Sequence, residues 1–436
     1  MIKQFVFLFL LFAFTASLTE AQTMPAGVDA NLWQRALKIH KKAVVVDGHN
    51  DIPSPMVDED FDINSDSRGK FHKQGGDPFH TDIARLNESG LTGFFFSIYV
   101  DRRFAEQAEK GSARRALDMI DATYRAVERY PNTFLFSTST ADIRRAKREN
   151  KIAALMGIEG GHAIENSLFA LRNFYRLGVR YMTLTHNNTN DWADSNWVDQ
   201  GREKSRHNGL SDFGKEVVRE MNRLGMLVDV SHVSNKTMAD VLDTTTAPVI
   251  ASHSSAQALA MHSRNINDDL LRRIAKNGGV VMINFYSAFI SQPYIDATRA
   301  RDARLKPELD RLREQYKDNL QTFETEREKI LAANPVPPPP YTVIVDHIDH
   351  IKKTAGIDNV GLGSDFDGVD SLPAGMTGVE SLPLVTYEML RRGYSEEDIR
   401  KVLGENFLRA FAQAEKVANI SNRKISGEGS LKRISK

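Results

Sequence analysis

Histidine and carboxylate side chains follow short apolar runs at six places in this sequence: His49, Glu159, His186, His232, His253 and Asp365. At the first place, His49 and Asp51 lie two positions apart in DGHNDIP. Residues two apart on an extended strand project from the same face, so this pair can hold one metal ion. The pair alone is weak evidence, because a single strand histidine is more often a hydrogen-bonded core residue.

Glu159 strengthens the metal interpretation. It ends the apolar run AALMGIE, and a carboxylate is costly to bury unless it is paired or bound to a metal. His232 and His253 follow two further runs and add two imidazoles. With His49 and Asp51, these residues suffice for two ions, and Glu159 is the expected bridge. Nitrogen and carboxylate ligands favour zinc, with manganese, cobalt or iron as alternatives.

Such a pair of ions predicts hydrolysis of an amide or an ester. Two ions roughly 3.5–4 Å apart hold a bridging hydroxide, the nucleophile, and polarise the scissile carbonyl. Asp365, in GSDFDG, is not needed as a ligand and is free to carry a proton to a leaving amine. His186 can donate to the oxygen that becomes the oxyanion.

The elements that carry these residues alternate between strands and helices. Apolar runs predict buried parallel strands at residues 44–49, 93–100, 153–160, 181–186, 226–232, 248–253, 280–286 and 360–368. Between most of them lie helical patterns that end in glycine. Eight strands predict an α/β fold of the (β/α)8 TIM-like barrel type, with a doubly wound open sheet as the alternative. Six of these runs end on a histidine, a glutamate or an aspartate. This favours the barrel, because all strands of a barrel end at one mouth, whereas an open sheet draws its site from a few loops.

The chain divides into four parts. Residues 1–21 contain a lysine, an apolar run and small residues at a cleavage position, which predicts a signal peptide; an uncleaved anchor helix is the alternative. The barrel is expected over residues 30–418. A charged helical and proline-rich insertion at about 291–342 is interpreted as a surface decoration, with a lid over the site as the alternative. Residues 419–436 form a polar tail.

Composition restricts the partners and the location. Basic and acidic residues both count 57, so nucleic acid and anionic membranes are not expected as partners, and small neutral or zwitterionic substrates are. The absence of cysteine excludes disulfides and a lipidated cysteine. Together with the predicted signal peptide, this composition leads us to expect an exported protein, periplasmic or secreted, without a stable membrane anchor.

Seven motifs in order resemble the membrane dipeptidase (renal dipeptidase) family of binuclear zinc peptidases. They are DGHNDIP, GIEGGHAI, LTHNNTNDWADS, VDVSHVS, ASHSSA, SRNINDD and GLGSDFDGV, and the resemblance covers residues 35 to 415. It implies two zinc ions per chain: His49 and Asp51 would hold the first, His232 and His253 the second, and Glu159 would bridge them.

The resemblance also implies substrate-binding roles. His186 matches the family's histidine that contacts the scissile carbonyl, and Asp365 matches the catalytic aspartate. Arg264 matches the arginine that pairs with the carboxylate of a dipeptide, which would limit cleavage to dipeptides. A structural alternative for Arg264 is a helix cap or a pair with Asp268. The family also cleaves dipeptides with a C-terminal D-residue.

The sequence departs from mammalian members of the family in several respects. A glycolipid anchor and a disulfide-linked dimer do not carry over, although a homodimer stays compatible with the sequence. Phe289 stands where a tyrosine is expected, which leaves the substrate preference open. Two other functions remain as alternatives: another amidohydrolase-type reaction, such as that of a lactonase, a deaminase or a β-lactam hydrolase, and an inactive peptide-binding relative.

Other polar residues are interpreted as structural. His162 is expected to orient a loop, and residues 346–350 (DHIDH) are expected on the solvated face of a helix. Residues 61–80 predict a long loop that could wall the substrate cleft. Asp47 and Asn50 are assigned to supporting the loop that carries His49 and Asp51.

Overall fold

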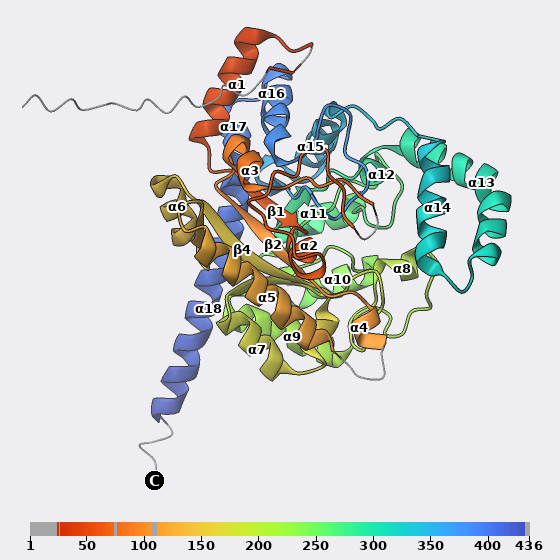
Figure 1. The fold of residues 1–436 in the computed structure, drawn as a ribbon. Coiled ribbons are helices and arrows are strands. Elements are labelled where there is room, and N and C mark those ends of the chain that lie inside the picture. The colour runs from red at the N-terminus through yellow and green to blue at the C-terminus, as the bar shows by residue number, and fades with distance from the viewer. Residues whose placement is uncertain (1–23, 26, 74–75, 107–110, 432–436) are drawn as a thin grey trace, which may run out of the picture.

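Eight parallel strands close into a barrel. The structure is a computed structural model that describes residues 24–25, 27–73, 76–106 and 111–431 (Figure 1). Each strand pairs with its neighbours in the ring, and β2 pairs with β4. The ring consists of β1 (Val46–Asn50), β2 (Gly93–Tyr99), β4 (Ile152–Glu159), β5 (Val179–Thr183), β6 (Leu227–Asp229), β7 (Ile250–Ala251), β8 (Val280–Ile283) and β9 (Val360–Leu362). The predicted (β/α)8 barrel is therefore confirmed.

A short ninth strand, β3 (Phe134–Phe136), was not predicted. It pairs with the amino end of β4 at Ile152, whereas β5 pairs with the same edge of β4 from Met156 onward. The two strands therefore share one edge of β4, and β3 adds no position to the ring. Three residues are too few for a period-two pattern to appear in the sequence.

Helices surround the barrel. They are α1 (Ala30–Lys42), α2 (Pro53–Asp58), α3 (Ile83–Ser89), α4 (Arg103–Glu106), α5 (Ser112–Arg129), α6 (Thr140–Glu149), α7 (Leu168–Arg176), α8 (Asn196–Asp199), α9 (Asp212–Leu224), α10 (Asn235–Thr244), α11 (Asp268–Asn277), α12 (Ser287–Ile290), α13 (Gln292–Gln315), α14 (Leu320–Ala332), α15 (Thr342–Ala355), α16 (Pro383–Arg391), α17 (Glu396–Arg400) and α18 (Asn406–Leu431). The helical patterns end where expected: Gly225 closes α9 and Gly278 closes α11, both in the left-handed conformation. Within the described residues, no helix has both the length and the apolar character that crossing a bilayer requires.

The barrel interior is filled by large side chains. Val46, Phe95 and Tyr181 belong to one buried cluster with Phe407 and Phe411 of α18. Val45 belongs instead to the cluster beneath the surrounding helices, so alternate valines of the first run fill the interior. Because α18 carries apolar side chains into the interior cluster, it closes one end of the barrel.

The predicted insertion and the predicted tail both fall on helical elements of the structure. The insertion forms the helix pair α13 and α14, which stands beside the barrel in Figure 1, and residues 335–341 follow it without helix or strand. The predicted tail at residue 419 begins inside α18, which continues to Leu431. The predicted signal peptide at 1–21 lies outside the described residues.

Candidate metal and catalytic site

The carboxyl ends of the strands bring all eight predicted site residues to one end of the barrel. His49 lies on β1, Glu159 ends β4, and the other six follow β1, β5, β6, β7 and β9 in the chain. Most of them line one cavity, namely Asp51, Glu159, His186, His232, Arg264 and Asp365. His49 and His253 lie beside it, within 3.4 Å of Glu159.

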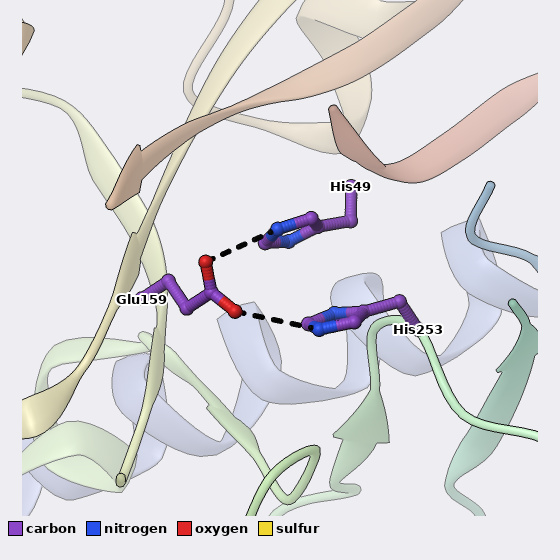
Figure 2. A group of neighbouring side chains, drawn as sticks. All are labelled: His49, Glu159 and His253. Atoms are coloured by element: carbon purple, nitrogen blue, oxygen red, sulfur yellow. Dashed lines mark ion pairs between the residues drawn. The ribbon is translucent and has the colours of Figure 1, made fainter. Parts of the chain in front are cut away.

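Glu159 stands between two pairs of side chains, and its two oxygens face different pairs. Oε2 lies 3.4 Å from His49 Nε2, which is also 3.3 Å from Asp51 Oδ2. Oε1 lies 2.9 Å from His232 Nε2 and 3.4 Å from His253 Nε2. Figure 2 shows the two oxygens of this carboxylate directed at different rings, one at His49 and the other at His253, which lie one above the other. One carboxylate with a separate nitrogen partner for each oxygen has the arrangement of a bridging ligand.

Nδ1 of His49 and Nδ1 of His232 are each hydrogen-bonded to a neutral oxygen acceptor. Tyr181 hydroxyl lies 2.8 Å from His49 Nδ1 and donates its own proton to the carbonyl of Gly48 at 3.2 Å. Asn187 Oδ1 lies 3.0 Å from His232 Nδ1. Each Nδ1 therefore has a proton that is held by an oxygen, and Nε2 is the nitrogen that faces Glu159.

His253 follows the same rule through a relay. Its Nδ1 lies 2.7 Å from Ser252 Oγ, and this hydroxyl donates to Asp229 Oδ2 at 2.6 Å. The serine oxygen thus accepts the proton of Nδ1, and Nε2 is the nitrogen that faces Glu159. Three imidazoles with their Nδ1 protons bound to oxygen acceptors match the way metal-ligating histidines are oriented in proteins.

The donor set fits divalent metal ions. His49 Nε2 is buried and has no hydrogen-bond partner within the described chain, although two carboxylates face it. Burial disfavours the charged form of Glu159, but the charge of His49 and the hydrogen bonds of the histidines outweigh it and hold the pKa of Glu159 well below its usual range. Groups that could hold an ion include His49 with Glu159 and His253. An anionic carboxylate among imidazole nitrogens suits zinc.

Asp365 lies beside this cluster without belonging to the pairs on Glu159. Burial raises the pKa of its carboxyl above the usual value, and the charges of His253 and His49 oppose the rise. One of its oxygens lies within metal-ligand reach of a ring nitrogen of His49 and a carboxylate oxygen of Asp51. Its backbone has a φ of 66°, a left-handed conformation that few residues other than glycine adopt.

His186 faces the same carboxylate from the β5 side. Its Nε2 lies 3.9 Å from Glu159 Oε1, and its ring packs edge-on against that of Tyr99, with the ring centroids 4.8 Å apart. Burial lowers the pKa of His186, so the imidazole is neutral near pH 7. It also falls within metal-ligand reach of Glu159 and His232, an association that the sequence did not suggest.

Arg264 does not pair with Asp268, which instead contacts His350 at 2.7 Å. Its guanidinium donates to the carbonyl of His253 at 3.1 Å and to Ser254 Oγ at 3.3 Å. Its Nε is buried and has no hydrogen-bond partner among the described residues. Burial lowers the pKa of Arg264 to about 10, so the group stays charged at neutral pH where it lines the cavity.

The cavity has a volume of about 780 Å³, and its outer part is built from two segments far apart in the sequence. His72 and Asp77 come from the predicted loop 61–80, and Glu324, Arg327 and Glu328 come from α14. The interpretation of the insertion as a surface decoration is therefore wrong, because α14 forms part of the cavity wall.

Most of the other polar residues have structural contacts. His162 Nε2 lies 2.9 Å from the carbonyl of Val100 and so anchors its loop. Asp47 accepts hydrogen bonds from Ser364, and Asn50 donates to Thr81. The prediction of a solvated face at 346–350 is wrong for His347, which is fully buried and bonded to Ala256 and Ile290.

Several supporting residues were missed by the sequence reasoning. Tyr181, Asn187, Ser252 and Asp229 hold the histidines, and Asn284 contacts Asp365. Asp229 and Ser252 lie in the same strand-end motifs as His232 and His253, so a search for acceptors near each ligand would have found them. Tyr181 and Asn284 have no comparable signal, because they are uncharged residues within apolar runs.

Comparisons with known proteins relate this chain to dipeptidases. Residues 33–425 match a family model described as membrane dipeptidase (peptidase family M19). The crystal structure of the probable dipeptidase PvdM from Pseudomonas aeruginosa is 25% identical, with a TM-score of 0.76 over 90% of this chain and 100% of that chain. The metallopeptidase dipeptidase AC is 25% identical, with a TM-score of 0.66 over 85% of this chain and 98% of the other.

A third structure has the same fold. It is a metallopeptidase from Rhodobacter sphaeroides in complex with a phosphinate mimic of the dipeptide L-Ala-D-Ala. It is 24% identical, and the match covers 85% of this chain and 99% of that chain, with a TM-score of 0.66.

Proposed function

We propose, from the premise that this chain belongs to the membrane dipeptidase family, a mechanism in which its strand-end residues hydrolyse dipeptides with two zinc ions. The family makes the protein a metallo-dipeptidase; the number of ions and the role of each residue are the proposal. The observation that carries it is the position of Glu159, whose two oxygens face different histidines.

Glu159 would bridge the two ions. His49 and Asp51 would complete the first site, and His232 with His253 the second. When bound, the zinc ions supply Lewis-acid activation of a water molecule and of the scissile carbonyl. The chain itself would present the Nε2 atom of each imidazole to the ions, because each Nδ1 proton is held by an oxygen acceptor.

Arg264 would orient the substrate. Its unpaired Nε and its position on the cavity wall suit the C-terminal carboxylate of a dipeptide. Because the guanidinium is buried and held by His253 and Ser254, the carboxylate can bind only at a fixed distance from Glu159. A tripeptide would place its scissile bond one residue away from the reacting position.

Asp365 and His186 would handle the protons and the developing charge. Asp365 would take a proton from the attacking water and deliver it to the leaving nitrogen as the C–N bond breaks. Burial raises its pKa, which favours a carboxyl that can hold that proton. The neutral imidazole of His186 would donate to the carbonyl oxygen as negative charge develops there.

Dipeptides with a C-terminal D-residue are included in the proposed substrates. The Rhodobacter sphaeroides relative is complexed with a mimic of L-Ala-D-Ala, which supports this class for the present chain. We further propose that the protein is exported to the periplasm or secreted, on the basis of the apolar run near its amino end.

A release assay with the zinc-loaded protein tests the proposal. L-Ala-L-Ala and L-Ala-D-Ala are expected to be cleaved, and L-Ala-L-Ala-L-Ala at least about 100-fold more slowly, because its carboxylate and scissile bond cannot both be placed. Equal rates for the tripeptide would contradict the role of Arg264. Asp365→Asn is expected to retain its zinc and lose roughly 100-fold to 10,000-fold in kcat. Near-normal turnover in that variant would remove Asp365 from the mechanism.

A further inference from the structure

Asn284 follows strand β8 and contacts Asp365. Its side chain is fully buried, and its Nδ2 donates a hydrogen bond to Asp365 Oδ2 at 2.7 Å. Within the described chain, no other side chain is hydrogen-bonded to this carboxylate. The end of β8 had no assigned chemistry in the sequence, because asparagine neither titrates nor commonly binds zinc.

The orientation of the Asn284 amide is fixed by a second contact. Its Oδ1 accepts a hydrogen bond from the backbone N–H of Tyr286 at 2.6 Å. A side-chain amide has one oxygen acceptor and one NH2 donor group. Because the oxygen is bound to Tyr286, the NH2 group is the end that faces Asp365.

Asp365 Oδ2 is therefore an acceptor, and Oδ1 is the oxygen that stays free to take a proton. Oδ1 lies on the Asp51 side of the cluster, because a Cβ atom on Gly368 would collide with both Asp365 Oδ1 and Asp51 Oδ2. The backbone of Asp365 is also fixed: its N–H donates to His49 at 3.2 Å, and its carbonyl accepts from Gly368 at 3.1 Å. Because the backbone of Asp365 is held, the hydrogen bond from Asn284 determines which oxygen of the Asp365 carboxylate has no side-chain partner among the described residues.

We infer that Asn284 is a positioning residue for proton transfer, which commits Asp365 Oδ2 and leaves Oδ1 to carry the proton. This inference rests on the proposed role of Asp365. In the reaction, Oδ1 accepts one proton from water as the water oxygen adds to the scissile carbonyl carbon. Oδ1 then gives that proton to the leaving nitrogen as the C–N bond breaks, so one dipeptide and one water yield two amino acids.

Asn284→Asp tests the inference, because it keeps the shape of the side chain and replaces the NH2 donor with an oxygen. We expect kcat to fall about 10-fold to 100-fold, a part of the general acid–base contribution, with KM within about threefold and zinc content unchanged. The solvent deuterium isotope effect on kcat should rise, since proton transfer becomes slower. Asn284→Leu, which adds no charge, should give the same result if the aspartate variant does not fold.

Asn359→Asp is the matched control. Asn359 directly precedes β9, at the amino end of the strand, and its Nδ2 donates to the carbonyl of Gly279 at 2.7 Å. This variant should lower the stability and leave kcat and the isotope effect unchanged. A folded Asn284→Asp or Asn284→Leu variant with kcat within twofold of the native enzyme and an unchanged isotope effect would overturn the inference.

The failure of the proposed function is distinguishable from this result. If Asp365→Asn keeps its turnover, Asp365 is not the proton carrier, whatever the Asn284 variants do. If Asp365→Asn is inactive and the Asn284 variants are normal, Asp365 keeps its role and Asn284 has none.

Discussion

Glu159 on the floor of the cavity and Glu328 on its outer wall are both carboxylates, but they are supported in different ways. Glu159 ends a strand that is buried at every position, and its side chain is 6% exposed. Glu328 is half-buried on α14, a helix in which no described residue is fully buried. The floor is fixed by strand pairing and by a network of buried hydrogen bonds. The wall is held by a helix with few apolar contacts.

The charges follow the same division. On the floor, His49, His232 and His253 each have a fixed acceptor for the Nδ1 proton. On the insertion helices, charged residues pair one turn apart, as Arg327 does with Glu324 at 3.3 Å and Lys306 with Asp310. Exposed pairs of this kind contribute little to stability, about 0–1 kcal/mol each. The comparison indicates that the chemistry depends on exact positions at the floor, whereas the wall mainly restricts access.

Replacing the bridging carboxylate is expected to have the largest effect. Glu159→Gln removes the charge that faces the imidazole nitrogens and leaves an amide that cannot bridge two cations. Metal content should fall below one ion per chain, and kcat/KM should fall by at least about 1,000-fold. Metal analysis together with kinetics on L-Ala-L-Ala would measure both. A variant that keeps two ions would contradict the assignment of Glu159 as the bridge.

Tyr181→Phe should have the next largest effect. It removes the hydroxyl that accepts the Nδ1 proton of His49 and leaves the ring in the barrel interior. Loss of such a partner typically costs about 10-fold to 100-fold in metal affinity, which a zinc titration against a chelator would measure. Tyr124→Phe is the matched control, because its hydroxyl donates to the carbonyl of Leu177 away from the cavity. Equal affinities in the two variants would remove Tyr181 from the site.

The floor could be predicted from the sequence largely because of topology. All strands of a parallel barrel end at one mouth, so His49, Glu159 and His253 could be placed together without coordinates. Tyr181 could not, because its ring reaches His49 across the barrel only where Gly157 leaves room; a side chain at that position would collide with the ring. Asn284 was missed for a different reason: its role depends on a contact with one oxygen of Asp365.

The wall could not be predicted from the sequence. The helical spacing of α13 and α14 was recognisable, but charges of both signs on all sides give no apolar stripe to indicate where a helix packs. The position of α14 became evident only from its contacts, for example Glu328 close to Gly76 of the loop that also lines the cavity.

Substitutions on the wall are expected to have smaller effects than those on the floor. Glu328→Gln removes a half-buried charge from the cavity rim and leaves the floor network intact. We expect kcat to change by less than about threefold and KM by no more than about tenfold, because a solvent-screened charge acts on binding and not on the reacting bond. A loss of 100-fold in kcat would place α14 in the catalytic machinery and break the division between floor and wall.

His40 provides the smallest expected effect on activity, since it is as buried as the floor but lies outside the cavity. Its Nε2 donates to the carbonyl of Ser89 at 2.9 Å, and its Nδ1 accepts from the hydroxyl of Thr386 at 2.7 Å, so the neutral ring is fully bonded. Burial lowers the pKa of His40 to about 4. The unfolded chain therefore takes up a proton below about pH 6.5, and the folded chain does so only near pH 4.

The contribution of His40 to the free energy of unfolding is complete above pH 6.5. It is lost as the pH falls toward 4, by about 3 kcal/mol at most. In His40→Gln, the free energy of unfolding, measured by urea titration at each pH, should fall less steeply over this window than in the native protein, with kcat unchanged at neutral pH. An equal slope in the two proteins would mean that the folded protein accepts the proton on His40. Burial at the floor and burial here then differ in purpose: one keeps nitrogen lone pairs available for metal, and the other satisfies both ring nitrogens and leaves none free.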